Sequence, residues 1–207
     1  MYGRFYIDDD LKEDLDKLLA ELNEKVNTAK NFHAGEIFPT DYTAVISQNV
    51  NHTELMQWGY PGFERQKVII NARSETALQK RMFEHGFVNN RCLIPVSGFY
   101  EWDKSKSKFY FCQKNEEVMY LGAIWDEFAG ERRFTILTRE ADEVMKPIHS
   151  RMPLIIAKEN RKRWMESLSD AKCMVYGAQP KIWGELAKDK KAEPEYEQIH
   201  IFNTFNL

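Results

Sequence analysis

The middle of the chain is a series of short segments rich in β-branched and aromatic residues, and this pattern constrains the fold most. Short polar stretches separate the segments, and no long amphipathic helix lies between them. Such a pattern is typical of strands that pair with their neighbours through hairpins. We therefore expect an antiparallel or mixed sheet, curled or closed, with helices outside it. The segments are Arg91–Trp102, Lys108–Gln113, Val118–Trp125 and Arg133–Thr138, with turns at Asp103–Ser107, Asn115–Glu117 and Phe128–Arg132.

The flanking sequence supplies helices and shorter strands. Residues 10–26 place leucines at helical spacing behind Asp8–Asp10, which predicts an amphipathic helix with an acidic cap and first turn. Ser74–Leu78 predicts the start of a helix that is capped by Ser74. The other expected elements are strands at Thr43–Ser47, Leu55–Trp58, Lys67–Asn71, Met152–Ala157 and Gln198–Phe205, and helices at Glu140–Lys146 and Lys158–Leu168.

The length and composition limit the class of protein. A chain of 207 residues is expected to form one domain, spanning residues 1–207. Its 43% of hydrophobic residues is enough for a core, so wholesale disorder is excluded. No apolar run approaches the roughly 18 residues that cross a bilayer, and the N-terminus lacks the apolar stretch of a signal peptide. Three cysteines without C-x-x-C spacing argue against a disulfide framework. We therefore expect a cytoplasmic monomer without membrane contact.

The charge is small overall but unevenly distributed. A net charge of −3 argues against bulk binding of nucleic acid. Residues 8–26 hold eight acids and three lysines, whereas residues 61–112 hold nine basic residues and five acids. This distribution permits a local basic surface in the middle of the chain.

Three polar residues next to strand-like runs are candidates for proton transfer or positioning. Glu101 sits between two aromatic residues, where a carboxyl group suits a general acid or base; alternatively it is an edge-strand residue paired with a lysine. His149 offers an imidazole, the usual proton carrier near neutral pH, or it is a hydrogen-bonded structural residue. Asn71 ends an apolar run, so its amide either orients a ligand or caps the turn.

Arginine and tryptophan residues in the same short segments are candidates for nucleic-acid contacts. Arg4, Arg73 and Arg151 each have the planar, multi-donor group that binds phosphate, although any one of them could form a surface ion pair instead. Trp58 and Trp102 could stack on bases, or they could belong to the core.

Metal and cofactor motifs are weak or absent. His33-x-x-Glu36 provides two possible ligands and no obvious third, so we expect no metal site. We find no phosphate-cradling glycine loop, no dinucleotide fingerprint and no G-x-S-x-G nucleophile turn, and we expect no cofactor.

Taken together, these segments resemble the signature blocks of the SRAP (SOS-response-associated peptidase) family, and the resemblance covers nearly the whole chain. The blocks are Asn71-Ala72-Arg73-Ser74-Glu75-Thr76, Arg91-Cys92-Leu93-Ile94-Pro95 with Gly98-Phe99-Tyr100-Glu101-Trp102, Ile136-Leu137-Thr138, and Ile148-His149-Ser150-Arg151-Met152-Pro153. The resemblance implies an α+β fold with a mixed, largely antiparallel β-barrel-like core and flanking helices. It also implies a role in the DNA damage response, on single-stranded DNA that carries an abasic site.

The resemblance also implies a chemistry. Family members expose an N-terminal cysteine after removal of the initiator methionine, and its amine and thiol close a thiazolidine on the abasic aldehyde. This DNA–protein crosslink needs both groups on one residue, because ring closure makes the adduct durable. On this pattern Glu101 and His149 carry protons, and Asn71 positions the reacting end of the chain. Three arginines would hold phosphates, and two tryptophans would shape the DNA at the lesion; they are Arg4, Arg73 and Arg151, and Trp58 and Trp102.

This chain departs from the family pattern at position 2, where Tyr2 replaces the family's cysteine. A phenol cannot close a thiazolidine, and a residue as bulky as Tyr2 should block removal of Met1. Three interpretations remain: a lyase-like imine step at the Met1 amine, a catalytically inactive DNA-binding module, or a native chain that carries cysteine at this position. A further alternative is a small-aldehyde or peptidase-type hydrolase that uses the same pocket.

Overall fold

The computed structural model describes residues 3–22, 32–47, 52–62, 67–114 and 118–187, and its centre is a closed ring of five strands. In ring order the strands are β12 (Glu131–Glu140), β4 (Thr53–Trp58), β3 (Tyr42–Ile46), β8 (Arg91–Val96) and β11 (Met119–Phe128). Four contacts in the ring are antiparallel, and the contact between β12 and β4 is parallel. Three short strands extend the barrel at β11 and β12: β7 (Asn71–Arg73), β13 (Arg151–Pro153) and β14 (Ile155–Ile156). The predicted α+β fold with a largely antiparallel, barrel-like core is therefore confirmed.

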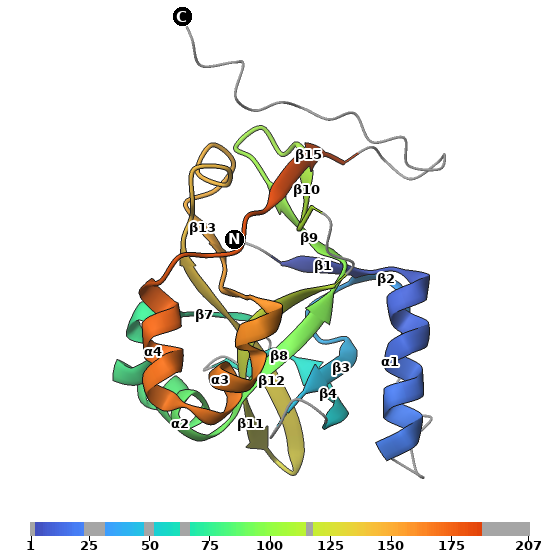
Figure 1. The fold of residues 1–207 in the computed structure, drawn as a ribbon, viewed down its shortest axis with the longest axis vertical. Helices are drawn as coiled ribbons and strands as arrows, with labels where there is room; N and C mark the ends of the chain where they lie inside the picture. Colours follow the sequence, from blue (N-terminus) through green and yellow to red (C-terminus); the bar gives the residue numbers. More distant parts are fainter. Residues whose placement is uncertain (1–2, 23–31, 48–51, 63–66, 115–117, 188–207) are drawn as a thin grey trace, which may run out of the picture.

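A second sheet of five antiparallel strands packs at one end of the barrel (Figure 1). Alternate residues along its strands, such as Phe5, Phe99 and Phe111, are fully buried in the core. Their neighbours along the strands lie on the other face of the sheet. Its strands, in order across the sheet, are β15 (Trp183–Leu186), β10 (Lys108–Cys112), β9 (Gly98–Trp102), β1 (Arg4–Ile7) and β2 (Gly35–Ile37). A separate hairpin pairs β5 (Tyr60–Pro61) with β6 (Val68–Ile69).

The segment that we predicted as one strand, Arg91–Trp102, is two strands in different sheets. β8 closes the barrel and β9 belongs to the second sheet, and the chain changes partners at Ser97. The Ser97 N–H donates to the carbonyl of Tyr6, and its Oγ accepts the N–H of Asp8. A Cβ at Gly98 would lie 2.4 Å from the Tyr110 ring, so only glycine fits directly after this change of direction. The bend places the end of β9 beside the start of β1.

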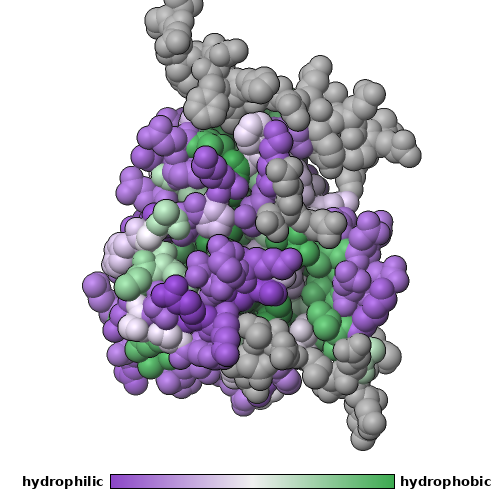
Figure 2. All heavy atoms as spheres, in the orientation of Figure 1, coloured by the Kyte–Doolittle hydropathy of each residue, from purple (hydrophilic) through white to green (hydrophobic). Residues whose placement is uncertain are grey.

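Helices lie on two sides of the sheets (Figure 1). Helix α1 (Asp9–Leu22) begins at the predicted cap, because the side chain of Asp8 accepts the N–H of Leu11 at 2.8 Å. Its buried leucines, Leu11, Leu15 and Leu19, join the core, and Figure 2 shows hydrophilic residues along its outer side. The last four residues of the predicted helix lie outside the described residues. The opposite side carries α2 (Arg81–Asn89), α3 (Arg161–Glu166), α4 (Leu168–Tyr176), η1 (Ser74–Gln79) and η2 (Lys158–Asn160).

Several local predictions were wrong. The predicted helix at Glu140–Lys146 is the end of β12 followed by turns, because Glu140 pairs with Arg151 of β13 and Pro147 has no N–H to continue a helix. Ser74 does not cap η1; its hydroxyl donates to the carbonyl of Thr138 instead. The turn predicted at Phe128–Arg132 is confined to Ala129 and Gly130, both with positive φ. The strand predicted at Gln198–Phe205 lies outside the described residues.

Candidate functional site

Four of the predicted site residues meet at one end of the long strand β12. On one side, β7 runs parallel to β12 and places Asn71 beside Ile136 and Arg73 beside Thr138. On the other side, β13 pairs antiparallel and places Arg151 beside Glu140, just after His149. Segments separated by about seventy residues in the sequence thus meet around Thr138. Asn71 lies within a strand rather than capping a turn.

Both terminal nitrogens of the Arg151 guanidinium form bonds within the protein. Its guanidinium binds both carboxylate oxygens of Glu75, at 2.7 and 2.8 Å, and donates to the carbonyl of Thr138 at 2.5 Å. The side chain is only 16% exposed. A bidentate pair of this kind is geometrically specific and hard to displace. Arg151 therefore joins η1 to β13, and we do not retain it as a direct phosphate contact.

Glu75, which the sequence analysis did not select as a site residue, completes this connection. It also accepts the N–H of Glu140 at 3.2 Å. Burial acts to raise the pKa of Glu75, but the hydrogen bonds from Arg151 and from backbone N–H groups outweigh it, so the pKa lies below its ordinary value. Glu75 is therefore an anion at neutral pH, as the ion pair requires. Its only sequence signal was its place in the block that begins at Asn71.

His149 is held through one of its ring nitrogens. Nδ1 lies 3.0 Å from the backbone nitrogen of Arg151 and 3.2 Å from its carbonyl oxygen. It accepts a hydrogen bond from the N–H in one tautomer and donates to the carbonyl in the other. Both contacts hold the ring through Nδ1.

Arg73 differs from Arg151 although both are in the same neighbourhood. Its side chain is exposed, and within the part of the chain that the structure describes it has no ion pair or hydrogen bond. An arginine held only by its strand can bind an external anion without breaking a bond inside the protein. Arg73 is therefore the better placed of the two for a phosphate.

A second group lies where β1 begins and β9 ends. Glu101 is only 2% exposed and accepts the N–H of Trp102 at 3.2 Å, so its burial rules out the exposed edge-strand alternative. Arg4, opposite Tyr100, places its guanidinium carbon 5.0 Å from the Trp102 ring centroid. Arg4 and Trp102 lie on one face of this pair of strands, and Glu101 lies on the core face.

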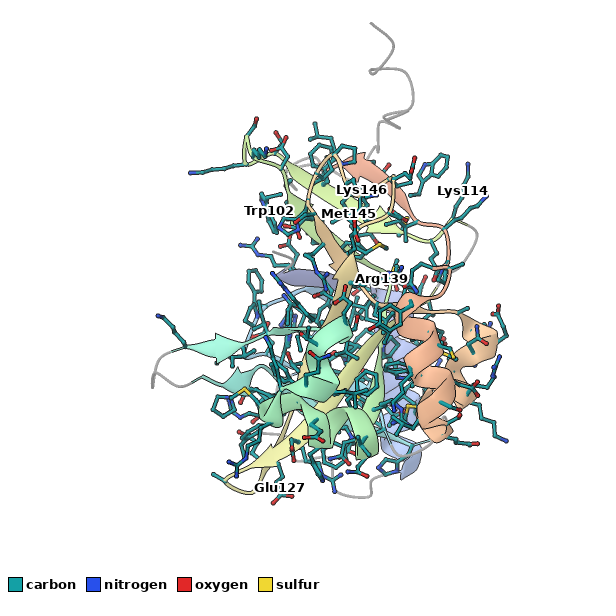
Figure 3. All side chains as sticks on the ribbon, turned by 90° about the vertical axis from the view of Figure 1, so that its left-hand side faces the viewer. Trp102, Lys114, Glu127, Arg139, Met145 and Lys146 are labelled. Carbon is teal, nitrogen blue, oxygen red and sulfur yellow. The ribbon has the colours of Figure 1, made fainter. Side chains whose placement is uncertain are left out.

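Trp102 lies toward the same end of the molecule as Met145 and Lys146, which belong to the connection between β12 and β13 (Figure 3). Apolar side chains of that connection, including Met145 and Ile148, belong to the same hydrophobic core cluster as Phe99 of β9. The connection that ends at His149 and the sheet that carries Glu101 therefore contribute to one core.

Two predicted site residues stand apart. Trp58 is fully buried, stacks on Phe134 at 6.3 Å, and donates its indole N–H to the carbonyl of Ile70. It is a core residue in this structure, and we do not retain it among the proposed DNA contacts. Tyr2 lies outside the described residues.

A cavity of about 360 Å³ lies away from these groups, and its lining includes Gln113, Lys158, Asn160 and Gln179. None of the predicted site residues lines it. Within the described ranges, no group of three or more His, Cys, Asp and Glu side chains could hold a metal ion. No helix in those ranges has the length and apolar character needed to cross a membrane.

Comparison with solved structures shows the same fold elsewhere. A protein from Bordetella bronchiseptica superposes with a TM-score of 0.71, covering 90% of this chain and 99% of that one at 21% identity. A protein from Bacteroides thetaiotaomicron gives a TM-score of 0.70, covering 90% and 92% at 18% identity. At these identities the likeness is evidence for the fold alone.

Sequence comparison identifies the family. The chain is 31% identical over 180 residues to the abasic site processing protein YedK of Escherichia coli, covering 80% of this chain and 79% of that protein. It is 31% identical over 157 residues to the abasic site processing protein YoaM of Bacillus subtilis, covering 65% and 69%. The family model for SOS response associated peptidase (SRAP) matches residues 1–183. The chain therefore belongs to the SOS response associated peptidase (SRAP) family.

Proposed function

We propose that this chain is a cytoplasmic monomer that binds single-stranded DNA carrying an abasic site and acts in the DNA damage response. The observation that carries the proposal is the grouping of an exposed Arg73, His149 and Asn71 at one end of β12. The sheet that carries Glu101 and the connection that ends at His149 contribute to the same hydrophobic core. Relatives over most of the chain are named abasic site processing proteins.

The proposed chemistry is a transient imine rather than a stable crosslink. The unprotonated amine of Met1 adds to the ring-opened aldehyde carbon, and loss of water forms the C=N bond. Loss of a C2′ proton then breaks the C3′–O bond and releases the 3′ phosphate. Glu101 and His149 are the groups that we assign to give and take the protons, and Asn71 to position the amine. Because Tyr2 has no thiol, no thiazolidine forms.

Borohydride trapping tests the covalent step. The protein is incubated with a single strand that holds one abasic site, with and without borohydride, and its intact mass is measured. We expect an adduct only with borohydride, together with strand scission without it. Glu101→Gln should bind the same strand with unchanged affinity and give no adduct. Binding without adduct or scission in the unsubstituted protein would leave a pure DNA-binding module.

Tyr2→Cys tests whether the rest of the site is intact. If only the thiol is missing, this variant should lose Met1 and form a crosslink without borohydride. Salt dependence tests the partner class, because each neutralised phosphate contributes about −0.7 to the log–log slope on a single strand. An affinity independent of salt would favour the alternative of a small-aldehyde or peptidase-type hydrolase.

A further inference from the structure

The cavity of about 360 Å³ is formed by three segments that are distant in the sequence. Gln113 follows β10, Lys158–Asn160 form η2, and Gln179 lies in the connection between α4 and β15. Sequence reasoning selected none of these as a site residue, and the proposed function uses none of them. A cavity of this size is large enough for a small molecule rather than for water alone.

Hydrogen bonds hold one wall of the cavity in place before any ligand binds. The side-chain carbonyl of Gln179 accepts the N–H of Ile155 at 2.7 Å. Arg139 of β12, labelled in Figure 3, donates to the carbonyl of Gly177 at 2.6 Å. The connection between α4 and β15 is thus fixed to two strands of the barrel. A wall that is already ordered loses little entropy when a ligand binds.

Several polar side chains at this cavity make no bond to the part of the protein that the structure describes. Asn160 precedes α3, where an asparagine commonly caps a helix, yet its side chain makes no capping hydrogen bond. Among the described residues, Gln113 and Lys158 also form no side-chain hydrogen bond or ion pair. The amide nitrogen of Gln179 remains a donor, because its carbonyl is the atom that binds Ile155. Three carboxamides and one ammonium group are therefore available to a ligand.

The charged side chains of the lining have opposite signs. Lys158 supplies a cation and Glu159 an anion, and both side chains are exposed. A phosphate group would be attracted by Lys158 but repelled by Glu159, whereas a zwitterion can bind both. Apolar side chains, such as Val118 and Pro180, complete the lining and suit the short aliphatic parts of a ligand.

We propose that the cavity binds a small zwitterion that carries amide groups and has the size of a dipeptide. Lys158 binds its carboxylate, and Glu159 binds its ammonium group. Its amide groups bind the carboxamides of Gln113, Asn160 and Gln179. A carboxamide offers the same donor and acceptor as a peptide group, so the two can form hydrogen bonds in both directions. The proposal does not depend on the proposed function.

An NMR titration of the isotope-labelled protein with the dipeptide L-alanyl-L-glutamine tests the site. We expect saturable shifts of the side-chain NH2 signals of Gln113, Asn160 and Gln179. The NH2 signal of Asn71, which lies in the candidate site at β12, should not move. Adenosine monophosphate carries a phosphate and no ammonium group, so it should leave the three cavity signals in place.

Two blocked dipeptides separate the two charges. Acetylation removes the ammonium group and amidation removes the carboxylate, and each should weaken binding roughly 3- to 10-fold through loss of one partly solvated charge contact. Lys158→Ala should lose only the preference for the free over the amidated dipeptide. Glu159→Gln should lose only the preference for the free over the acetylated dipeptide. Lys162→Ala removes an exposed lysine of α3 that does not line the cavity, so it should keep both preferences.

Three outcomes would overturn the inference. If millimolar dipeptide leaves the three NH2 signals unmoved, the cavity is not a site for such a ligand. If adenosine monophosphate moves them and the dipeptide does not, the ligand class is wrong. If Lys158→Ala and Glu159→Gln keep both preferences of the unsubstituted protein, these charges do not bind the termini of the dipeptide. DNA binding tests the proposed function separately, because no residue of the cavity is assigned to it.

Discussion

Two arginines near the end of β12 differ in what their guanidinium groups bind. Arg151 donates to Glu75 and Thr138, whereas Arg73, two strands away across β12, keeps its guanidinium exposed. The sequence gives both the same chemistry, and only the partners differ. Because Glu75 neutralises Arg151 inside the protein, Arg151 contributes to the order of the loop at His149, and Arg73 is left for an external anion.

The Glu75–Arg151 pair gives a prediction about stability and pH. Glu75→Gln should lower the free energy of unfolding by about 1–3 kcal/mol at pH 7, because it removes the charge from a bidentate, partly buried pair. The pKa of Glu75 is lowered in the folded protein, so its contribution is present above its unfolded pKa and is lost as the pH falls through the folded value. Urea unfolding at a series of pH values measures this difference.

The comparison needs an acid of the same chain without the ion pair. Glu140→Gln is suitable, since the Glu140 side chain is exposed at the end of β12. Its effect should stay within about 0.5 kcal/mol at every pH. If Glu75→Gln also stays within that range, or if its effect persists unchanged in acid, then the pair does not stabilise the fold.

At the scale of elements, local pattern predicted most strands but not their partners. The strands near 43–47, 55–58, 108–113, 118–125 and 133–138 are present, because their β-branched and aromatic residues favour extended backbone wherever they pair. The break at Ser97 could not be predicted, since it depends on hydrogen bonds to Tyr6 and Asp8, about ninety residues away. The helix predicted near Glu140 failed for a similar reason, because Glu140 pairs with Arg151 on the distant strand β13.

Helix α1 allows a matched test of the amphipathic pattern. Leu15 is 2% exposed and packs in the core, whereas Leu18 is 40% exposed on the same helix. Leu15→Ala should lower the free energy of unfolding by about 2–5 kcal/mol through lost burial and a cavity. Leu18→Ala should change it by about 0.5 kcal/mol or less. Chemical denaturation of both variants provides the measurement, and equal losses would contradict this placement of the helix.

For the whole molecule, closure of the barrel positions the candidate site. This closure could not be predicted from the sequence. Closure requires β4 to lie parallel to β12, and β7 also pairs parallel to β12; no hairpin signal predicts such contacts between distant strands. The residue types at the site were identifiable from the motif blocks, including Asn71, Glu101 and His149. Glu75 was not selected, because its role comes from Arg151, which only the folded chain brings beside it.

The closed barrel also shields its interior from solvent, and the reactivity of the three cysteines measures this shielding. Cys92 on β8 is fully buried, and burial raises the pKa of its thiol well above the ordinary value. Burial also raises the pKa of Cys112, which is partly buried on β10, whereas Cys173 is exposed on α4. Since the thiolate is the reactive form, a raised pKa and poor access both slow alkylation.

Timed alkylation followed by peptide mass mapping should therefore modify Cys173 first and Cys112 more slowly. Cys92 should react only as fast as the protein unfolds globally, because the barrel that encloses it has no free edge to open. Added urea below the unfolding midpoint should speed the reaction of Cys92 in proportion to the unfolded fraction and leave that of Cys173 nearly unchanged. Modification of Cys92 in native buffer at a rate close to that of Cys173 would mean that β8 separates locally from β3 or β11, and that the ring is not closed in solution.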